Sequence, residues 1–169
     1  MEVFDAVRTV LAVRDYSDKP LPPKTILRIA EAAHLTASSR NGQPWHFIFV
    51  QDPATLKKLG EAVKTGPYIA QAPLAVAVAM EDSPYNVSDA SRAIQSMVLV
   101  AWEDGVGSNW AGFANTPEVN KVLGIPEDLK VLAVVPFGYP KRPGGKGKKQ
   151  RKPFGEVVHR ERFGQPIEA

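Results

Sequence analysis

The sequence predicts one domain that mixes α-helices and β-strands, in an α+β or three-layer α/β arrangement. Segments with the spacing of amphipathic helices alternate along the chain with short apolar runs rich in β-branched residues. The chain has 169 residues, 44% of them hydrophobic, which is enough to bury roughly 70% of its unfolded surface around one core. Because no internal repeat or domain linker interrupts this order, we expect a single domain over residues 1–169.

Two helices are expected at the N-terminus. The first is indicated by five apolar residues that fall on one helical stripe and are expected to be buried: Val3, Phe4, Val7, Val10 and Leu11. After an extended stretch at 15–20, Pro22-Pro23 can start a second helix, because proline fits the first helical turn. This helix ends in the polar segment Ser38–Pro44, and its apolar face is formed by Ile26, Ile29, Ala30 and Ala33.

A strand, a helix and a second strand are expected next. Trp45–Val50 is aromatic and β-branched, which favours a strand, and it stops before Asp52-Pro53, an N-cap residue followed by a helix-starting proline. The helix would direct Leu56, Leu59 and Val63 inward. The run Pro73–Met80 is apolar without interruption, which is typical of a central strand buried on both faces.

The segment Ser88–Glu103 predicts a long helix with more apolar surface than one buried face needs. Leu99, Val100 and Trp102 occupy much of the circumference that the main apolar face leaves, so we expect one side to meet a partner subunit. Gly105 is a typical residue for the end of such a helix. The main face is formed by Ala90, Ala93, Ile94, Met97, Val98 and Ala101.

The last third of the chain is expected to hold a short helix and a third strand before it becomes irregular. Thr116-Pro117 can start the helix, Gly124 can end it, and Val131–Phe137 has the composition of a buried strand. The run 139–153 is rich in Gly, Pro and Lys and is expected to form a basic loop. Residues 154–169 are expected to form a C-terminal arm that packs on another chain.

The formal net charge of +3 conceals this basic loop. Without the seven cations of 141–152, the chain has 14 basic and 18 acidic residues. Such a run can be a solvated charge run, a binding site for a phosphorylated ligand or a nucleic-acid contact. Aromatic residues on which bases could stack are not interleaved with the cations, which argues against nucleic acid. The seven are Lys141, Arg142, Lys146, Lys148, Lys149, Arg151 and Lys152.

Residues that the chain lacks exclude several classes of function. Without cysteine, no disulfide framework, thiolate metal site or cysteine nucleophile is possible, and we expect a cytoplasmic protein. His34, His46 and His159 belong to three separate elements, so no metal site is expected. The chain lacks the Gly-x-Ser-x-Gly motif of serine hydrolases and the third glycine of a dinucleotide fingerprint. Charged residues near the N-terminus leave no apolar region of a signal peptide, so none is expected. No uncharged run is long enough for a membrane span, so none is expected either.

The segment Ser38–Trp45 is the most informative stretch for function. Two hydroxyls and two primary amides stand within six residues, between the end of a helix and the start of a strand. Side chains and backbone can converge there on a planar ligand with many hydrogen-bonding groups. By composition alone, a helix C-cap followed by a turn explains the same residues.

The order of several short motifs resembles the nitroreductase family of FMN-dependent oxidoreductases. The family typically shows Arg-Arg-Ser-x-Arg-x-Phe, then Pro-Ser-Ser-x-Asn-x-Gln-Pro-Trp, then a helix with Asp-x-x-x-Ala-x-Gln that leads to Gly-x-Gly-Ser. Leu-Gly-Ile-Pro, Gly-Tyr-Pro and a basic segment follow. The corresponding residues are Arg14-Asp-Tyr16, Ser38-Ser-Arg-Asn41-Gly-Gln43-Pro-Trp45, Asp89-x-x-x-Ala93-x-Gln95, Gly105-Val-Gly107-Ser108, Leu123-Gly-Ile-Pro126 and Gly138-Tyr-Pro140.

The resemblance implies a fold, an assembly and a reaction. The fold would be a three-layer α/β/α sandwich with a central, mainly antiparallel sheet, and the assembly an intertwined homodimer with FMN in the subunit interface. In the implied reaction, NAD(P)H reduces the flavin by hydride transfer. The oxidised nucleotide, NAD(P)+, then leaves and is replaced by a nitroaromatic, a quinone or a similar conjugated acceptor, which is a ping-pong mechanism.

The resemblance also assigns residues to the flavin. Arg14 is expected beside the N1/O2 edge, where a positive charge stabilises the reduced flavin. The backbone of Trp110, Ala111 and Gly112 is expected to approach N5. No catalytic side chain is expected, because the flavin carries the chemistry. Contacts with the ring system are expected from Ser38, Ser39, Asn41 and Gln43.

The chain departs from the family pattern where the phosphate of FMN would bind. Val10-Leu11-Ala12 stands in place of Arg-Arg-Ser, so two cations and a hydroxyl are missing. A buried phosphate needs other cations, and Lys149, Arg151 and Arg8 are the candidates. The same departure motivates an alternative, a flavin-binding protein of this fold with little or no NAD(P)H turnover.

Overall fold

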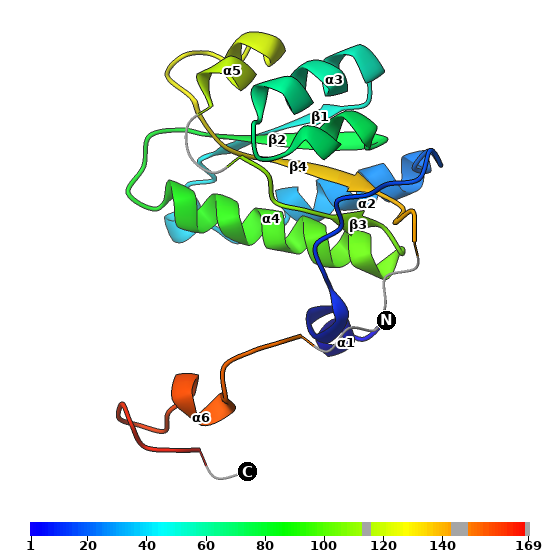
Figure 1. Cartoon of the computed structure of the whole chain (residues 1–169). Coiled ribbons are helices and arrows are strands. Elements are labelled where there is room, and N and C mark those ends of the chain that lie inside the picture. Colours follow the sequence, from blue (N-terminus) through cyan, green and yellow to red (C-terminus); the bar gives the residue numbers. More distant parts are fainter. Residues whose placement is uncertain (113–115, 143–148, 168–169) are drawn as a thin grey trace.

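The computed structural model describes residues 1–112, 116–142 and 149–167. Its sheet has the strand order β1-β2-β4-β3 (Figure 1). Each neighbouring pair of these strands is antiparallel, which confirms the mainly antiparallel central sheet that the resemblance implies. The strands are β1 (Trp45–Val50), β2 (Leu74–Met80), β4 (Lys130–Gly138) and the short β3 (Gly107–Ser108).

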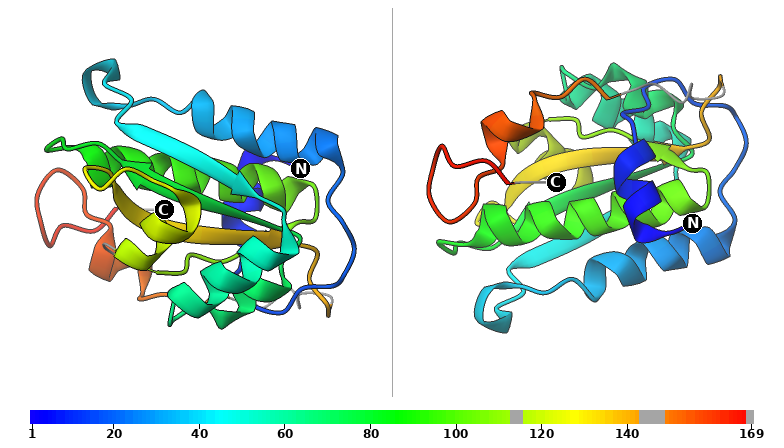
Figure 2. Two further views of the ribbon diagram at one scale, coloured as in Figure 1. Left: turned by 90° about the horizontal axis from the view of Figure 1, so that it is seen from above. Right: turned by 90° about the horizontal axis from the view of Figure 1, so that it is seen from below.

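Helices cover both faces of the sheet, which gives three layers (Figures 1 and 2). On one face, α2 (Pro23–His34) and α4 (Asn86–Glu103) pack against each other. The other face carries α3 (Pro53–Ala62) and α5 (Pro117–Leu123), together with the short helix η2 (Pro67–Gln71). The predicted α/β/α sandwich is therefore confirmed.

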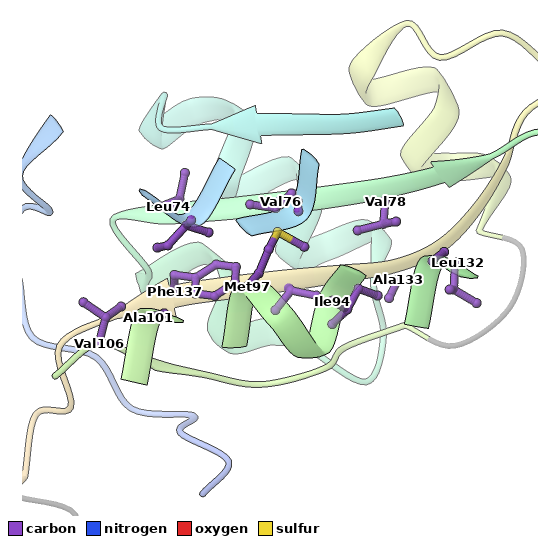
Figure 3. Packing of buried hydrophobic residues seen from close by; sticks show 14 of the residues in the cluster. Leu74, Val76, Val78, Ile94, Met97, Ala101, Val106, Leu132, Ala133 and Phe137 are labelled. Atoms are coloured by element: carbon purple, nitrogen blue, oxygen red, sulfur yellow. The ribbon is translucent and has the colours of Figure 1, made fainter. Parts of the chain in front are cut away.

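Strand β2 shows how one sheet supports two cores. All of its side chains are buried, as its continuous apolar run predicted. Because successive side chains of a strand point to opposite faces, the large residues of β2 gather on the side of α2 and α4 and the alanines on the side of α3. Figure 3 shows the first cluster, which includes Leu74, Val76, Val78, Ile94, Met97 and Phe137. The second cluster includes Ala75, Ala77, Ala79, Leu59 and Val63.

The predicted helix boundaries are confirmed where local chemistry sets them. The carboxylate of Asp52 caps α3 and accepts hydrogen bonds from the backbone N–H of Thr55 at 2.8 Å and from its hydroxyl at 2.7 Å. Gly124 follows α5 with a φ of 65°, a left-handed conformation that favours glycine. Local sequence signals are therefore sufficient to place these ends.

The first helix differs from the prediction in length and in burial. Helix α1 covers Val3–Thr9 and ends early because Ala12 pairs with Ser108, which draws the chain into an extended conformation. The helix lies across α4, but Val3 and Phe4 are 76% and 74% exposed (Figure 2). The prediction that its apolar stripe is buried is therefore wrong for the single chain.

After α1, the chain runs along the edge of the sheet. The N–H of Val13 donates to the carbonyl of Ser108 at 2.8 Å, and the N–H of Ser17 donates to the carbonyl of Tyr139 at 2.9 Å. Tyr16 is buried between these contacts and its hydroxyl donates to the carbonyl of Val13 at 2.6 Å. Burial raises the pKa of this hydroxyl, so it stays protonated and remains a donor.

The C-terminal arm leaves the body of the molecule (Figure 1). The arm contains a short helix, α6 (Phe154–Val157), which the sequence did not predict. Further along the arm, beyond this helix, Phe163 is 90% exposed. None of the described residues of the arm joins either core cluster.

Lys146 and Lys148 of the predicted basic loop lie outside the described residues. Among the described residues, no helix has the length and apolar character needed to cross a membrane.

Candidate functional site

A cavity of about 490 Å³ opens between the N-terminal segment and α4. Its walls come from the end of α1 and the residues after it, from the middle of α4, from β3 and the residues after it, and from two cations near the arm. A volume of this size suits a small ligand or part of a cofactor. The cavity is lined by Val7, Val10, Leu11, Ala12, Ile94, Gln95, Val98, Ser108, Asn109, Trp110, Lys149 and Arg151.

The residues Val10–Ala12 reach the cavity because the extended segment that contains them pairs with β3. The bridge between Ala12 and Ser108 is parallel, and the segment continues past the cavity at Val13. Gly107 permits this close approach, since a Cβ there would lie 2.3 Å from Cγ2 of Val13. The first residue of β3 is therefore glycine for a packing reason, and the packing shapes one wall of the cavity.

Lys149 and Arg151 bring positive charge to the cavity. The ammonium of Lys149 donates to the carbonyl of Val7 at 2.6 Å, which ties it to the end of α1. Burial and the nearby Arg151 guanidinium lower the pKa of Lys149 from its ordinary value. Among the described residues that line this cavity, none has an acidic side chain. Two neighbouring cations in such surroundings favour an anionic ligand.

Lys149 and Arg151 lie in the same cavity as Val10-Leu11-Ala12, the residues that replace the Arg-Arg-Ser of the family pattern. Val10 to Ala12 line the same cavity and supply no charge there. Arg8, the third candidate, does not line the cavity, and its guanidinium donates to the carboxylate of Asp5 at 2.8 Å. The residues present therefore fit the terminal phosphate of FMN through Lys149 and Arg151.

Arg14 does not line the cavity of the single chain. It is exposed and lies two residues beyond Ala12, in the segment between Val13 and the buried Tyr16. The backbone on both sides of Arg14 is held by the edge of the sheet, through Val13 and through the bridge between Tyr16 and Pro140. The position of the Arg14 backbone is thus fixed next to one wall of the cavity, and its role toward the flavin stays a prediction.

The residues after β3 contribute a polar and an aromatic group to the cavity. Asn109 is buried, and its Nδ2 donates to the hydroxyl oxygen of Tyr68 and to the carbonyl of Trp110 at 3.0 Å. Trp110, which the resemblance implies lies near the flavin, also lines the cavity. The contact with Tyr68 of η2 holds this stretch of backbone in place.

Ala111 and Gly112 turn away from the cavity. Ala111 is buried and pairs with Val134 of β4 through two backbone hydrogen bonds of 2.8 and 3.1 Å. The N–H of Gly112 donates to the hydroxyl of Thr65 at 3.1 Å. Neither residue lines the cavity of the single chain, and the predicted approach of their backbone to N5 stays a prediction.

The segment Ser38–Gln43 lies apart from the cavity in the single chain. It follows α2 and sits beside the N-terminal end of α4, whereas α1 crosses the C-terminal half of that helix (Figure 2). Ser38 and Ser39 are half-buried, and Asn41 and Gln43 are exposed. The four predicted ring contacts and the two predicted phosphate contacts therefore come from separate surfaces of one chain.

Three uncharged polar residues of the cavity, Gln95, Ser108 and Asn109, were not predicted as site residues. Gln95 belongs to the Asp-x-x-x-Ala-x-Gln motif, and it lies three residues before Val98, a spacing that could have indicated a shared helix face. Asn109 follows the Gly-x-Gly-Ser motif directly, but no sequence signal shows that its side chain turns inward. Among the described residues, no three His, Asp or Glu side chains come together in a group that could hold a metal ion.

The fold and the cavity define a three-layer α/β/α protein with a cationic, cofactor-sized site. The family described as "Putative TM nitroreductase" matches residues 2–168. The chain therefore belongs to the nitroreductase family.

Known relatives and solved structures agree with this membership. The "Putative NADH dehydrogenase/NAD(P)H nitroreductase" of Archaeoglobus fulgidus is 37% identical over 150 residues, which cover 83% of this chain and 86% of the relative. The "FMN reductase [NAD(P)H]" of Bacillus subtilis is 27% identical, over 96% of this chain and 74% of the relative. The structure of an FMN-dependent nitroreductase from Clostridium difficile superposes with a TM-score of 0.84 at 25% identity, covering 95% of this chain and 99% of that one.

Proposed function

We propose that this protein is an FMN-dependent oxidoreductase that takes hydride from NAD(P)H and passes electrons to a nitroaromatic, a quinone or a similar conjugated acceptor. The observation that carries the proposal is the pair Lys149 and Arg151 in a cavity where the lining residues that the structure describes include no acid. FMN, when bound, would supply the hydride chemistry, and the protein would supply binding, orientation and electrostatics. NAD(P)H and FMN are both available in the cytoplasm, which agrees with the cytoplasmic location expected for this protein.

The chain's own residues would divide three tasks. Lys149 and Arg151 would hold the phosphate of FMN by charge-assisted hydrogen bonds. Val98 and Trp110 would provide apolar walls that exclude water from the cavity. Arg14 would stabilise the negative charge that arrives with the hydride.

The proposed assembly is a homodimer that brings the two halves of the site together. In one chain, the Ser38–Gln43 segment is separate from the cavity. In addition, Val3 and Phe4 of α1 and Phe163 of the arm are exposed apolar side chains of the kind that interfaces cover. A second copy would cover these side chains and present its own Ser38–Gln43 segment to the cavity, with its arm wrapped around the first copy.

A ping-pong mechanism would follow from the use of one cavity by donor and acceptor in turn. Initial rates measured at several NAD(P)H and acceptor concentrations should give parallel lines in double-reciprocal plots. Intersecting lines would refute this part of the proposal.

The visible spectrum of the purified protein tests the central proposal. Protein reconstituted with FMN should show a flavin absorption band that NAD(P)H bleaches under argon and that an added quinone restores. A bound flavin that stays oxidised would instead favour the alternative, a flavin-binding protein with little turnover. The apolar lining at Val10 to Ala12 is the observation that favours this alternative.

A further inference from the structure

A buried carboxylate ties the Ser38–Gln43 segment to α4. Asp89 lies in the first turn of α4 and is 1% exposed. Both of its carboxylate oxygens accept from the backbone N–H of Ser39 at 3.1 Å, and Oδ1 also accepts from the Ser39 hydroxyl at 3.0 Å. Arg92, one turn further along α4, donates to the same Oδ1. Burying a carboxylate is costly unless it is paired and hydrogen-bonded in this way.

The segment that Asp89 holds has an unfavourable backbone conformation. Arg40, Asn41 and Gln43 have φ values of 53°, 56° and 50°. This left-handed region is disfavoured for residues with a Cβ, so three such residues among four need compensating contacts. Ser38 supplies one contact, since its Oγ accepts from the N–H of Gln43 at 2.9 Å, but this bond lies within the segment itself. The bonds to Asp89 connect the segment to the rest of the molecule.

One copy of α4 carries parts of two proposed flavin sites: a wall of its own cavity, and the attachment of the Ser38–Gln43 segment that would contact the flavin of the neighbouring copy. Asp89 lies six residues before Gln95 and nine before Val98, which line the cavity. At about 1.5 Å per residue, these separations correspond to roughly 9–14 Å along the helix axis. The position of the Ser38–Gln43 segment is therefore set relative to the same rigid element that forms a wall of the cavity.

We propose that Asp89 is a positioning residue that holds Ser38–Gln43 in the left-handed conformation in which this segment contacts the flavin of a neighbouring copy. This inference rests on the proposed function and deepens it, because it names the group that orders the ring-binding segment. Asp89 itself would not touch the flavin.

The variant Asp89→Asn and a matched control test the proposal. Asparagine keeps one oxygen acceptor, but it places an NH₂ group where the second oxygen accepted, and it removes the negative charge that pairs with Arg92. Asp52→Asn is the control, because Asp52 accepts the same pair of bonds from Thr55 that Asp89 accepts from Ser39. Asp52 lies at the start of α3, on the opposite face of the sheet.

The first measurement needs no flavin. In protein free of FMN, amide hydrogen exchange over residues 38–43 should become roughly tenfold faster or more in Asp89→Asn, the effect expected for loss of a charge-assisted hydrogen bond. Exchange over β2 should stay unchanged, as should exchange over 38–43 in Asp52→Asn. Unchanged exchange over 38–43 in Asp89→Asn would overturn the proposal, as would faster exchange throughout the molecule.

The second measurement uses the flavin. The Kd for FMN should rise roughly tenfold or more in Asp89→Asn, and the midpoint potential of the bound flavin should shift, because ring contacts made by the segment are lost. Both quantities should stay unchanged in Asp52→Asn. Faster exchange combined with an unchanged Kd and potential would overturn the role toward the flavin.

Two further outcomes are separable. If Asp89→Asn does not fold, Ser39→Ala removes the hydroxyl bond and leaves the carboxylate, and it should still accelerate exchange over 38–43. If the wild-type protein does not bind FMN, the proposed function is refuted, and with it the role of Asp89 toward the flavin. The exchange comparison would then still show whether Asp89 holds the segment.

Discussion

The substitution Lys149→Met should selectively weaken the binding of ligands that carry a phosphate. Methionine keeps an apolar stem of similar length, so the packing of the lysine stem beside the cavity is largely retained. The ammonium donates one hydrogen bond to the carbonyl of Val7, which leaves two of its three donors for a ligand. The variant therefore removes charge and donors without opening a large gap.

The size of the effect follows from the local arrangement. A hydrogen bond to a charged partner contributes about 1.5–3 kcal/mol, which corresponds to a roughly 10- to 150-fold rise in Kd. Arg151 remains in the variant and limits the loss to this range. Arg151→Ala should show a rise of the same order, whereas Lys152→Met, which removes an exposed cation outside the cavity, should leave the Kd unchanged.

Fluorescence titration with two ligands separates a phosphate contact from a general loss of structure. FMN and riboflavin share the ring system, but riboflavin lacks the phosphate. Lys149→Met should raise the Kd for FMN and leave the Kd for riboflavin unchanged. An equal loss of affinity for both ligands, or no loss for either, would refute the assignment of the phosphate to Lys149.

Three further predictions concern the same region. Arg14→Ala should slow flavin reduction by NAD(P)H roughly tenfold, a loss of about 1.4 kcal/mol, with a smaller effect on the Kd for FMN; equal effects in stopped-flow and binding experiments would contradict its role. Gly107→Ala should destabilise the protein by about 1–3 kcal/mol in urea unfolding, because the added Cβ would lie 2.3 Å from Cγ2 of Val13, whereas Gly155→Ala adds a Cβ in open space and should be nearly neutral. The pKa of Lys149 is lowered in the folded protein, so its ammonium loses its proton at a lower pH than an ordinary lysine, whose pKa is about 10.4. Because neutral lysine cannot pair with phosphate, the affinity for FMN should begin to fall, as the pH is raised, before that value is reached. Lys149→Met should abolish this part of the pH profile.

Local signals in the sequence were sufficient for most of the fold. The strand predicted over Trp45–Val50 has the same bounds as β1 in the structure, because its aromatic and β-branched run stops just before the helix-starting pair Asp52-Pro53. The uninterrupted apolar run Pro73–Met80 correctly indicated a strand buried on both faces, which the structure places at Leu74–Met80. In contrast, the two-residue strand Gly107–Ser108 is too short to show any periodicity, and its pairing depends on partners at 12–13 and 137–138.

The site was less predictable because it depends on which surfaces meet. The stripe on α1 has helical spacing, but spacing does not show whether the residues that cover it belong to the same chain, and Phe4 is exposed. Lys149 and Arg151 were candidates because the resemblance implies a cation from the closing segment at the phosphate. The structure distinguishes them from Arg8, which does not line the cavity and donates to Asp5. The separation of Ser38–Gln43 from the cavity arises from the arrangement of α2 and α4, which no local pattern encodes.

The detachment of the arm from both cores separates folding from assembly along this chain. Since the described residues of 154–167 join neither buried cluster, a truncated chain that ends near Pro153 should keep a cooperative unfolding transition. Substitutions in the arm can then alter quaternary structure at little expense to the folded body. Such a tail can diverge in length and sequence faster than the sandwich from which it extends.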